Sequence, residues 1–432
     1  MRFGWLVLIA ALQLAAAQTE AAPPEPTTAT LEDAIIHALG NHYGILEAKE
    51  LYRQSRYRIE EERAALRPQV TLGSSVGLVH EEEPELTNSD RYGYGNTRIE
   101  LSHSLYDGGV RRYRIDGVAW GSEGAFFEYR RELERTVMHT IEAYTQLHFA
   151  SERTEIHSRN LERLEEILEI VTAKREAGAA SRGDVSSIEA SVSNARAALI
   201  QTRSGLHNTI AQYEYLLQEK ADNLWPEGIL FDLKLEPREV VLKRIEEENS
   251  LLQMTRVKIR AKQSEVSSQR AAYKPDIALS LSHQAEESWS GGDGRKDQTR
   301  FMLNLNHTLY DGNRRDAAHA RLLSEVTGLR HRLEDDRRKL RWEATQLYNT
   351  LNSIDEAITN TQEEIRANRD MVETYWERFF QASQDLETLL QAQRQLNSAE
   401  LTLNEQKQNR ILDFFELKKH KGLLLDHFHI GL

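Results

Sequence analysis

Residues 101–112, LSHSLYDGGVRR, and residues 305–316, LNHTLYDGNRRD, are near copies of each other at an offset of 204 residues. Upstream, residues 66–72, LRPQVTL, resemble residues 273–279, YKPDIAL, at an offset of 207. Several matches at nearly the same spacing indicate that the chain contains an internal duplication.

Each copy contains two stretches in which apolar and polar residues alternate, as in a strand with one apolar face. The apolar positions are Val70, Leu72, Val76, Leu78, Ile99, Leu101 and Leu105 in the first copy and Ile277, Leu279, Leu281, Phe301, Leu303, Leu305 and Leu309 in the second. The alternation continues through His103 and His307, and polar loops at 80–91 and 284–299 separate the two strands of each predicted hairpin. A soluble sheet with one wet face would show the same pattern. The remainder of the chain supplies no second layer to cover such a sheet, which favours a transmembrane barrel with apolar residues outside and polar residues inside.

The repeated Tyr-Asp-Gly stands where the period of two gives way to helical spacing. Asp107 and Asp311 are placed to cap the first turn of a helix, and Gly108 and Gly312 permit a sharp exit from the strand. We therefore interpret the repeated phrase as a strand-to-helix joint.

Helical spacing dominates the rest of each copy. The expected helices are 31–66, 109–177 and 184–219 in the first copy and 238–272, 313–381 and 388–422 in the second. Apolar or small residues repeat every three or four positions from Val185 to Leu216 and from Leu389 to Leu403, which is typical of a coiled coil. At ~1.5 Å per residue the second helix of each copy spans about 100 Å, and the shorter third and first helices stacked end to end span about 105 Å. Each copy should thus form two columns of equal length beneath a hairpin.

The first seventeen residues differ from the rest of the chain. Arg2 precedes an apolar run and three alanines, which predicts a secretory signal peptide rather than a membrane anchor, because the run is shorter than the ~20 residues of a membrane span. The predicted division is a signal peptide at 1–17, an N-terminal tail at 18–30, a first repeat at 31–220, a linker at 221–237, a second repeat at 238–422 and a C-terminal tail at 423–432.

Composition narrows the functional classes. The 432 residues carry a net charge of -13, which argues against non-specific nucleic-acid binding, and they include no cysteine for disulfides or thiolate metal sites. We found no arrangement of residues typical of a catalytic centre and expect neither an enzyme nor a bound cofactor. His420, His427 and His429 are expected to lie in a solvated tail rather than to bind a metal.

In the order of its elements the chain resembles the TolC family of outer-membrane channels. The resemblance includes the duplicated unit, the LYDGG joint, Tyr144 and Tyr348 at equivalent positions, and GAASRGDVSSIEA from Gly178. It implies a homotrimer in which four strands per chain build a twelve-stranded barrel in outer-membrane lipid above an α-helical periplasmic tunnel. Four strands cannot close a barrel, which agrees with this assembly.

The resemblance also implies a function. The chain would be the passive exit duct of a tripartite efflux pump or a type I secretion system, with a periplasmic adaptor docked on the tunnel tip and an inner-membrane transporter reached indirectly. The alternative is a periplasmic coiled-coil adaptor, which would have one helical hairpin flanked by small β domains.

The tip carries the candidate docking residues. In the family a glycine followed six residues later by an aspartate marks the turn between the long helices; Gly178 and Asp184 match, whereas the second copy has Ala382 and Thr388. The same residues admit a purely structural interpretation, with Gly178 ending a helix, Asp184 capping the next one, and Thr388 forming a capping box with Gln391.

The entrance gate is expected beside this second turn. Family members commonly place aspartates at the start of the returning helix, where this chain has Thr388 and Gln391. Gln384, Asp385 and Glu387 lie just before these positions, and at most one of the two acidic residues is expected to face the lumen and restore negative charge. The resemblance thus predicts an entrance closed mainly by helix packing and hydrogen bonds, with weak block by multivalent cations.

Overall fold

The computed structural model describes residues 30–82, 89–217, 234–289, 294–381 and 385–431, so the predicted signal peptide lies outside the described residues. In the first repeat the elements are α1 (Leu31–Asn41), α2 (Tyr43–Ala64), β1 (Gln69–Glu82), β2 (Ser89–Tyr106), α3 (Val110–Glu176) and α4 (Arg182–Leu217). In the second they are α5 (Arg238–Glu248), α6 (Ser250–Ala271), β3 (Asp276–Trp289), β4 (Arg295–Asn306), α7 (Arg314–Phe380), α8 (Leu386–His420) and α9 (Leu424–His427). The expected order of helix, hairpin, helix and helix is thus present twice.

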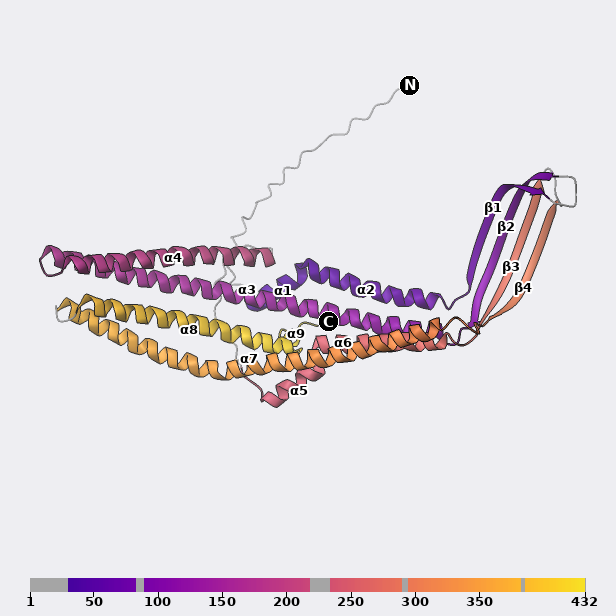
Figure 1. Ribbon diagram of the computed structural model, residues 1–432. Helices are drawn as coiled ribbons and strands as arrows, with labels where there is room; N and C mark the ends of the chain where they lie inside the picture. Colours follow the sequence, from indigo (N-terminus) through magenta and orange to yellow (C-terminus); the bar gives the residue numbers. More distant parts are fainter. Residues whose placement is uncertain (1–29, 83–88, 218–233, 290–293, 382–384, 432) are drawn as a thin grey trace, which may run out of the picture.

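Each repeat is built on one very long helix. α3 and α7 contain 67 residues each and run from the sheet to the opposite end of the molecule, which we call the tip (Figure 1). α4 and α8 return along the tip half of these helices, while α1 and α2, or α5 and α6, occupy the sheet half. α3 also packs on α6 and α8, so the two repeats lie side by side.

The first helix of each repeat is broken, where the sequence suggested continuous helices over 31–66 and 238–272. His42 and Asn249 have extended backbone conformations, with ψ of 114° and 124°, and each separates two helices. The Asn249 side chain accepts hydrogen bonds from the amides of Leu251 at 3.0 Å and Leu252 at 3.2 Å. These bonds satisfy two of the free amides that begin a helix, and so they stabilise the restart without a proline.

The strands form one antiparallel sheet in the order β1-β2-β3-β4. β2 pairs with β3, and this pairing joins the hairpins of the two repeats. The strands reach further into the expected loops than the polar residues suggested, ending and restarting at Glu82 and Ser89 and at Trp289 and Arg295.

β4 ends earlier than expected. It stops at Asn306, so His307 and Leu309 lie outside the strand, and the Leu309 side chain is 88% exposed. The guanidinium group of Arg315 donates to the carbonyl oxygen of Thr308 at 2.8 Å and holds this segment at the start of α7.

Buried apolar side chains form one cluster at the tip and a larger one where the halves of each column meet. The predicted C-terminal tail belongs to the larger cluster: Leu424 and Leu425 of α9 are 0% and 1% exposed. His420 ends α8 with a side chain only 13% exposed, and the His427 ring lies 5.6 Å from that of Phe415. The expectation of a solvated tail was therefore wrong for His420 and His427, because the apolar residues around them complete the core, whereas His429 is exposed as expected.

Candidate functional site

One face of the sheet is apolar and uncovered. The strand register places Val70, Leu101, Leu281 and Phe301 side by side across all four strands. Val70 is 62% exposed and Phe301 is 70% exposed. The next row, on the opposite face, is Thr71, Glu100, Ser282 and Arg300. An exposed apolar band of this size requires a partner surface or lipid.

The first strand-to-helix joint is built as the sequence predicted. Asp107 accepts hydrogen bonds from the amides of Gly109 and Arg111, both at 2.9 Å. Gly108 and Gly109 have φ angles of 72° and 97°, in the left-handed region that favours glycine. The carboxylate thus caps α3 immediately after the chain leaves β2.

The second joint uses the same geometry with an added clamp. Asp311 accepts from the backbone amide of Arg315 at 3.2 Å and from its Nε at 2.8 Å, after Gly312 with a φ of 66°. The Arg315 guanidinium also donates to the carbonyl of Ala272 at 3.2 Å and lies 4.8 Å from the centre of the Tyr273 ring. It therefore ties the end of α6 to the start of α7.

At the tip, the turn between α3 and α4 begins at Gly178. The Gly178 amide donates to the carbonyl of Arg175 at 2.9 Å, and that of Ala179 donates to Lys174 at 2.7 Å. With a φ of 78° at Gly178, this pair of bonds is a Schellman motif. A Cβ atom at Gly178 would meet no atom within 4 Å, so the turn presents bare backbone to its surroundings.

Asp184 does not cap α4 as expected. Ser181 occupies the cap: its hydroxyl accepts from the Asp184 amide at 3.1 Å, while the Asp184 carboxylate accepts from the Ser181 amide at 2.7 Å. Asp184 is therefore the acidic member of a reciprocal capping box that starts one turn earlier.

The second turn lies between α7 and α8. Ala382 and Gln384 are outside the described residues. Asp385 caps α8 by accepting from the Thr388 amide at 2.9 Å, so the expected capping box of Thr388 with Gln391 is wrong. Hydrogen bonding from Thr388 holds the pKa of Asp385 below its usual value, which keeps this carboxylate charged.

The two turns lie at the same end of the molecule and share one apolar cluster (Figure 1). Phe379 of α7 and Leu389 of α8, which are 6% and 0% exposed, pack with Ile188 of α4. The Lys174 ammonium of α3 donates to the Phe379 carbonyl and lies 3.8 Å from the centre of its ring. The sequence analysis missed Lys174; its basic charge in the last turn of a helix was the available signal.

The two acidic candidate gate residues, Asp385 and Glu387, are already engaged in contacts within the chain. Glu387 accepts from the Arg394 guanidinium at 2.8 Å and from the Ser187 hydroxyl at 3.5 Å. Thr388 is half-buried and Gln391 is exposed. Of the two acidic candidates, therefore, Asp385 caps a helix and Glu387 is ion-paired.

Nothing in this arrangement resembles a reaction centre. Among the described residues, no three His, Asp or Glu side chains are grouped so that they could hold a metal ion. In the same part of the chain, no helix is long and apolar enough to cross a membrane. The features available for function are surfaces: the apolar strand face and the helical tip.

Both repeats match one protein family. The model of the family described as "Outer membrane efflux protein" matches residues 34–214 and 241–422. Outer membrane efflux protein BepC of Brucella suis biovar 1 (strain 1330) is 23% identical over 289 residues. That match covers 67% of this chain and 62% of BepC, so it spans less than two thirds of this relative.

Solved structures share the fold. The transmembrane channel protein CusC superposes with a TM-score of 0.82 at 14% identity, covering 91% of this chain and 92% of CusC. The outer membrane protein VceC of Vibrio cholerae superposes with a TM-score of 0.80 at 14% identity, covering 91% of this chain and 96% of VceC. These matches extend over both repeats, whereas the adaptor alternative requires a single helical hairpin.

Proposed function

The chain belongs to the outer membrane efflux protein family, and from this premise we propose that it is the outer-membrane exit duct of an export machine. The duct is passive and not an enzyme: a transporter elsewhere supplies the energy, and this chain provides the path to the exterior. The substrates are small molecules expelled by an efflux pump or unfolded protein from a type I secretion system.

The observation that carries this proposal is the uncovered apolar face of the sheet. Leu303 and Leu305, on the edge strand β4, are 65% and 66% exposed, and Leu72 on the opposite edge strand is 73% exposed. In water such a face would be costly at about 25 cal/mol per Å² of exposed apolar surface, whereas in a bilayer it meets lipid tails. The polar face on the other side then lines an aqueous lumen.

The two edge strands require further copies of the chain. β1 pairs with β2 and β4 pairs with β3, so each edge strand has one side unpaired in the sheet. In lipid every backbone group needs a partner, and barrels satisfy this need by closing. Three chains would supply 3 × 4 = 12 strands, within the range of bacterial barrels of about eight or more. We therefore infer a homotrimer.

The tip is proposed as the docking surface for a periplasmic adaptor, which connects the duct to an inner-membrane transporter. Gly178 and the Ser181–Asp184 box expose backbone and a carboxylate in the first turn. In the second turn the Asp385 carboxylate caps α8 by accepting a hydrogen bond from the Thr388 amide. The proposed docking surface also contains Ala382 and Thr388, the equivalent positions of the second turn, although this turn lacks the glycine and aspartate of the first. The capping bonds also support a structural role for Gly178 and Asp184, and the two roles require separate tests.

The entrance is proposed to close without a free acidic ring. Asp385 accepts a hydrogen bond from the Thr388 amide, and Glu387 is ion-paired with Arg394. Gln384 and Gln391 carry neutral amides. Apolar packing around Phe379 and the Lys174 contact with its carbonyl link the two tip turns of one chain. We propose that packing and hydrogen bonds of this kind keep the resting entrance narrow.

Fractionation followed by single-channel recording tests the proposed function. The expected result is a detergent-stable trimer in the outer-membrane fraction that conducts ions when added to a planar bilayer. A soluble monomer in the periplasm, or a trimer that never forms channels, would refute the exit-duct proposal.

A further inference from the structure

The end of α8 is held against the junction between α5 and α6. The Asn249 side-chain Nδ2 donates to the His420 carbonyl at 2.9 Å, while the Oδ1 of the same side chain accepts from the Leu251 amide and caps α6. Gly422 follows with a φ of 70°, and its carbonyl accepts from Arg130 of α3 at 2.7 Å. A Cβ atom on Gly422 would lie 2.5 Å from the Glu248 carbonyl oxygen, so the backbones are in close contact here.

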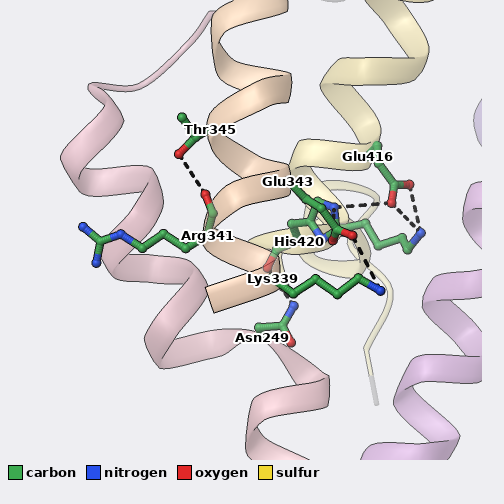
Figure 2. A network of polar contacts seen from close by, with 8 residues as sticks. Asn249, Lys339, Arg341, Glu343, Thr345, Glu416 and His420 are labelled. Atoms are coloured by element: carbon green, nitrogen blue, oxygen red, sulfur yellow. Dashed lines mark hydrogen bonds and ion pairs between the residues drawn. The ribbon is translucent and has the colours of Figure 1, made fainter. Parts of the chain in front are cut away.

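The His420 imidazole lies between two carboxylates at this contact. Its Nε2 is 3.6 Å from Glu416 of α8 and 3.9 Å from Glu343 of α7 (Figure 2). Each carboxylate also has a lysine: Lys419 lies 2.8 Å from Glu416, and Lys339 lies 3.9 Å from Glu343. Two negative and two positive charges therefore balance while the imidazole is neutral.

Protonation would upset this balance. A proton on His420 would leave one excess positive charge on a side chain that is only 13% exposed. Burial lowers the pKa of His420, and Lys419 adds to this effect, against the opposing attraction of Glu416 and Glu343. Asn249, which approaches from the α5–α6 junction, is uncharged and supplies no counter-charge.

We propose that His420 is a proton-operated latch: with a neutral imidazole the end of α8 stays docked on the α5–α6 junction and α9 stays packed against α3 and α8, and acid releases them. This device goes beyond the proposed export function and does not depend on it. Its structural output is the exposure of Leu424 and Leu425, which are fully buried in the docked state.

The direction of the pH effect follows from linkage. A histidine whose pKa is lowered in the docked state binds its proton more readily once released. The docking free energy is therefore fully present above the ordinary histidine pKa of about 6.5 and is lost as the pH falls from there toward the lowered value. In acid, the equilibrium constant for release of the α8 end should increase roughly tenfold for every pH unit by which the docked pKa of His420 lies below the released pKa.

A second buried titratable group at this junction, Glu134, responds to pH in the opposite direction. Glu134 of α3 accepts from Ser250 at 2.7 Å and from Arg130 at 3.2 Å, and burial raises its pKa despite these contacts. Acid would thus favour its folded form. Variants at His420 are needed to separate the two contributions.

The first repeat shows that the latch is not a requirement of the fold. Its equivalent positions, by the same offsets of 207 and 204, are His42 and Leu216. His42 makes no side-chain capping bond to α2, and Leu216 is apolar and partly buried in the core cluster. An apolar residue can therefore occupy the position of His420 without loss of the architecture.

Hydrogen exchange on the purified assembled protein in detergent tests the latch. Amides of residues 418–430 are compared at about pH 7.5 and about pH 5, after correction for the intrinsic pH dependence of exchange. The wild type should show faster corrected exchange in acid, and His420→Gln should abolish the difference. Glu343→Gln should enlarge it, because removing one attracting carboxylate lowers the docked pKa further.

His157→Gln is the matched control. His157 is another partly buried histidine whose pKa is lowered by burial, but it lies on α3 in the tip half. This variant should keep the wild-type pH response at residues 418–430. A wild type without a pH response, or a His420→Gln variant that retains it, would overturn the latch; channel recordings made in parallel report separately on the export function.

Discussion

Replacing Leu101 by arginine tests whether the apolar face of the sheet meets lipid. Leu101 lies in β2 five positions before its end at Tyr106, with Val70 and Leu281 as its lateral neighbours. At ~3.4 Å per residue and a tilt of about 45°, this places it about 12 Å above the helical end of the strand. A lipid-facing band is ~25 Å tall, so Leu101 falls near its middle, where arginine costs about 2–4 kcal/mol.

That cost is a loss of about 30- to 900-fold in the folding equilibrium of each chain. It should appear as a lower urea midpoint for folding into lipid vesicles and as less detergent-stable trimer in the outer-membrane fraction. Leu305 lies one position from the end of β4, so Leu305→Arg should cost only about 0–1 kcal/mol.

The neighbouring Ser102 provides the control. It lies at nearly the same depth but on the opposite face, paired with Gln69 and Ser280. Ser102→Arg should leave folding nearly unchanged because its side chain enters the aqueous lumen. Equal losses for Leu101→Arg and Ser102→Arg, or no loss for either, would refute the assignment of the two faces.

Three further predictions concern the tip. Gly178→Val should leave the trimer assembled and reduce export. Asparagine tolerates a positive φ, so Gly178→Asn should retain export if only the turn conformation matters. Failure of the valine variant to assemble would contradict the docking role. Wild-type channels should be weakly blocked by a trivalent cation on the periplasmic side in planar bilayers, and Arg394→Gln should strengthen the block by freeing Glu387; tight wild-type block abolished by Glu387→Gln would disprove the neutral gate. Lys174→Met should raise the resting conductance by removing a cation–π contact worth about 0.5–2 kcal/mol, while Arg175→Met should not.

The repeated parts of the fold could be predicted from the sequence, because each is determined by interactions between residues close together in the chain. The joints at Asp107 and Asp311 combine a capping carboxylate with a residue that tolerates a positive φ, and the structure confirms both. The coiled-coil positions Val185, Ile188 and Val192 are likewise buried as their spacing predicted.

The missed features depend on contacts between distant segments. The restart of the helix at Asn249 involves a bond to the His420 carbonyl, 171 positions away, and no proline or glycine announces it. Leu424 and Leu425 looked like part of a short tail because ten residues are too few to show a period. At the tip, Ser181 and Asp385 offered caps one turn before the expected ones, and the choice depended on backbone geometry.

The equal length of α3 and α7 restricts how such a duct can grow. Both helices have 67 residues, and each is tied to a neighbour along its tip half by a seam that repeats every seven residues. One added residue would lengthen a helix by ~1.5 Å and rotate everything beyond it by about 100°, turning buried side chains toward water. Seven residues restore the seam and add about 10.5 Å, but only if α4 and α8 gain the same number. Ducts of this design should therefore differ in reach by whole heptads inserted in four helices at once, with the rim at the tip remaining level.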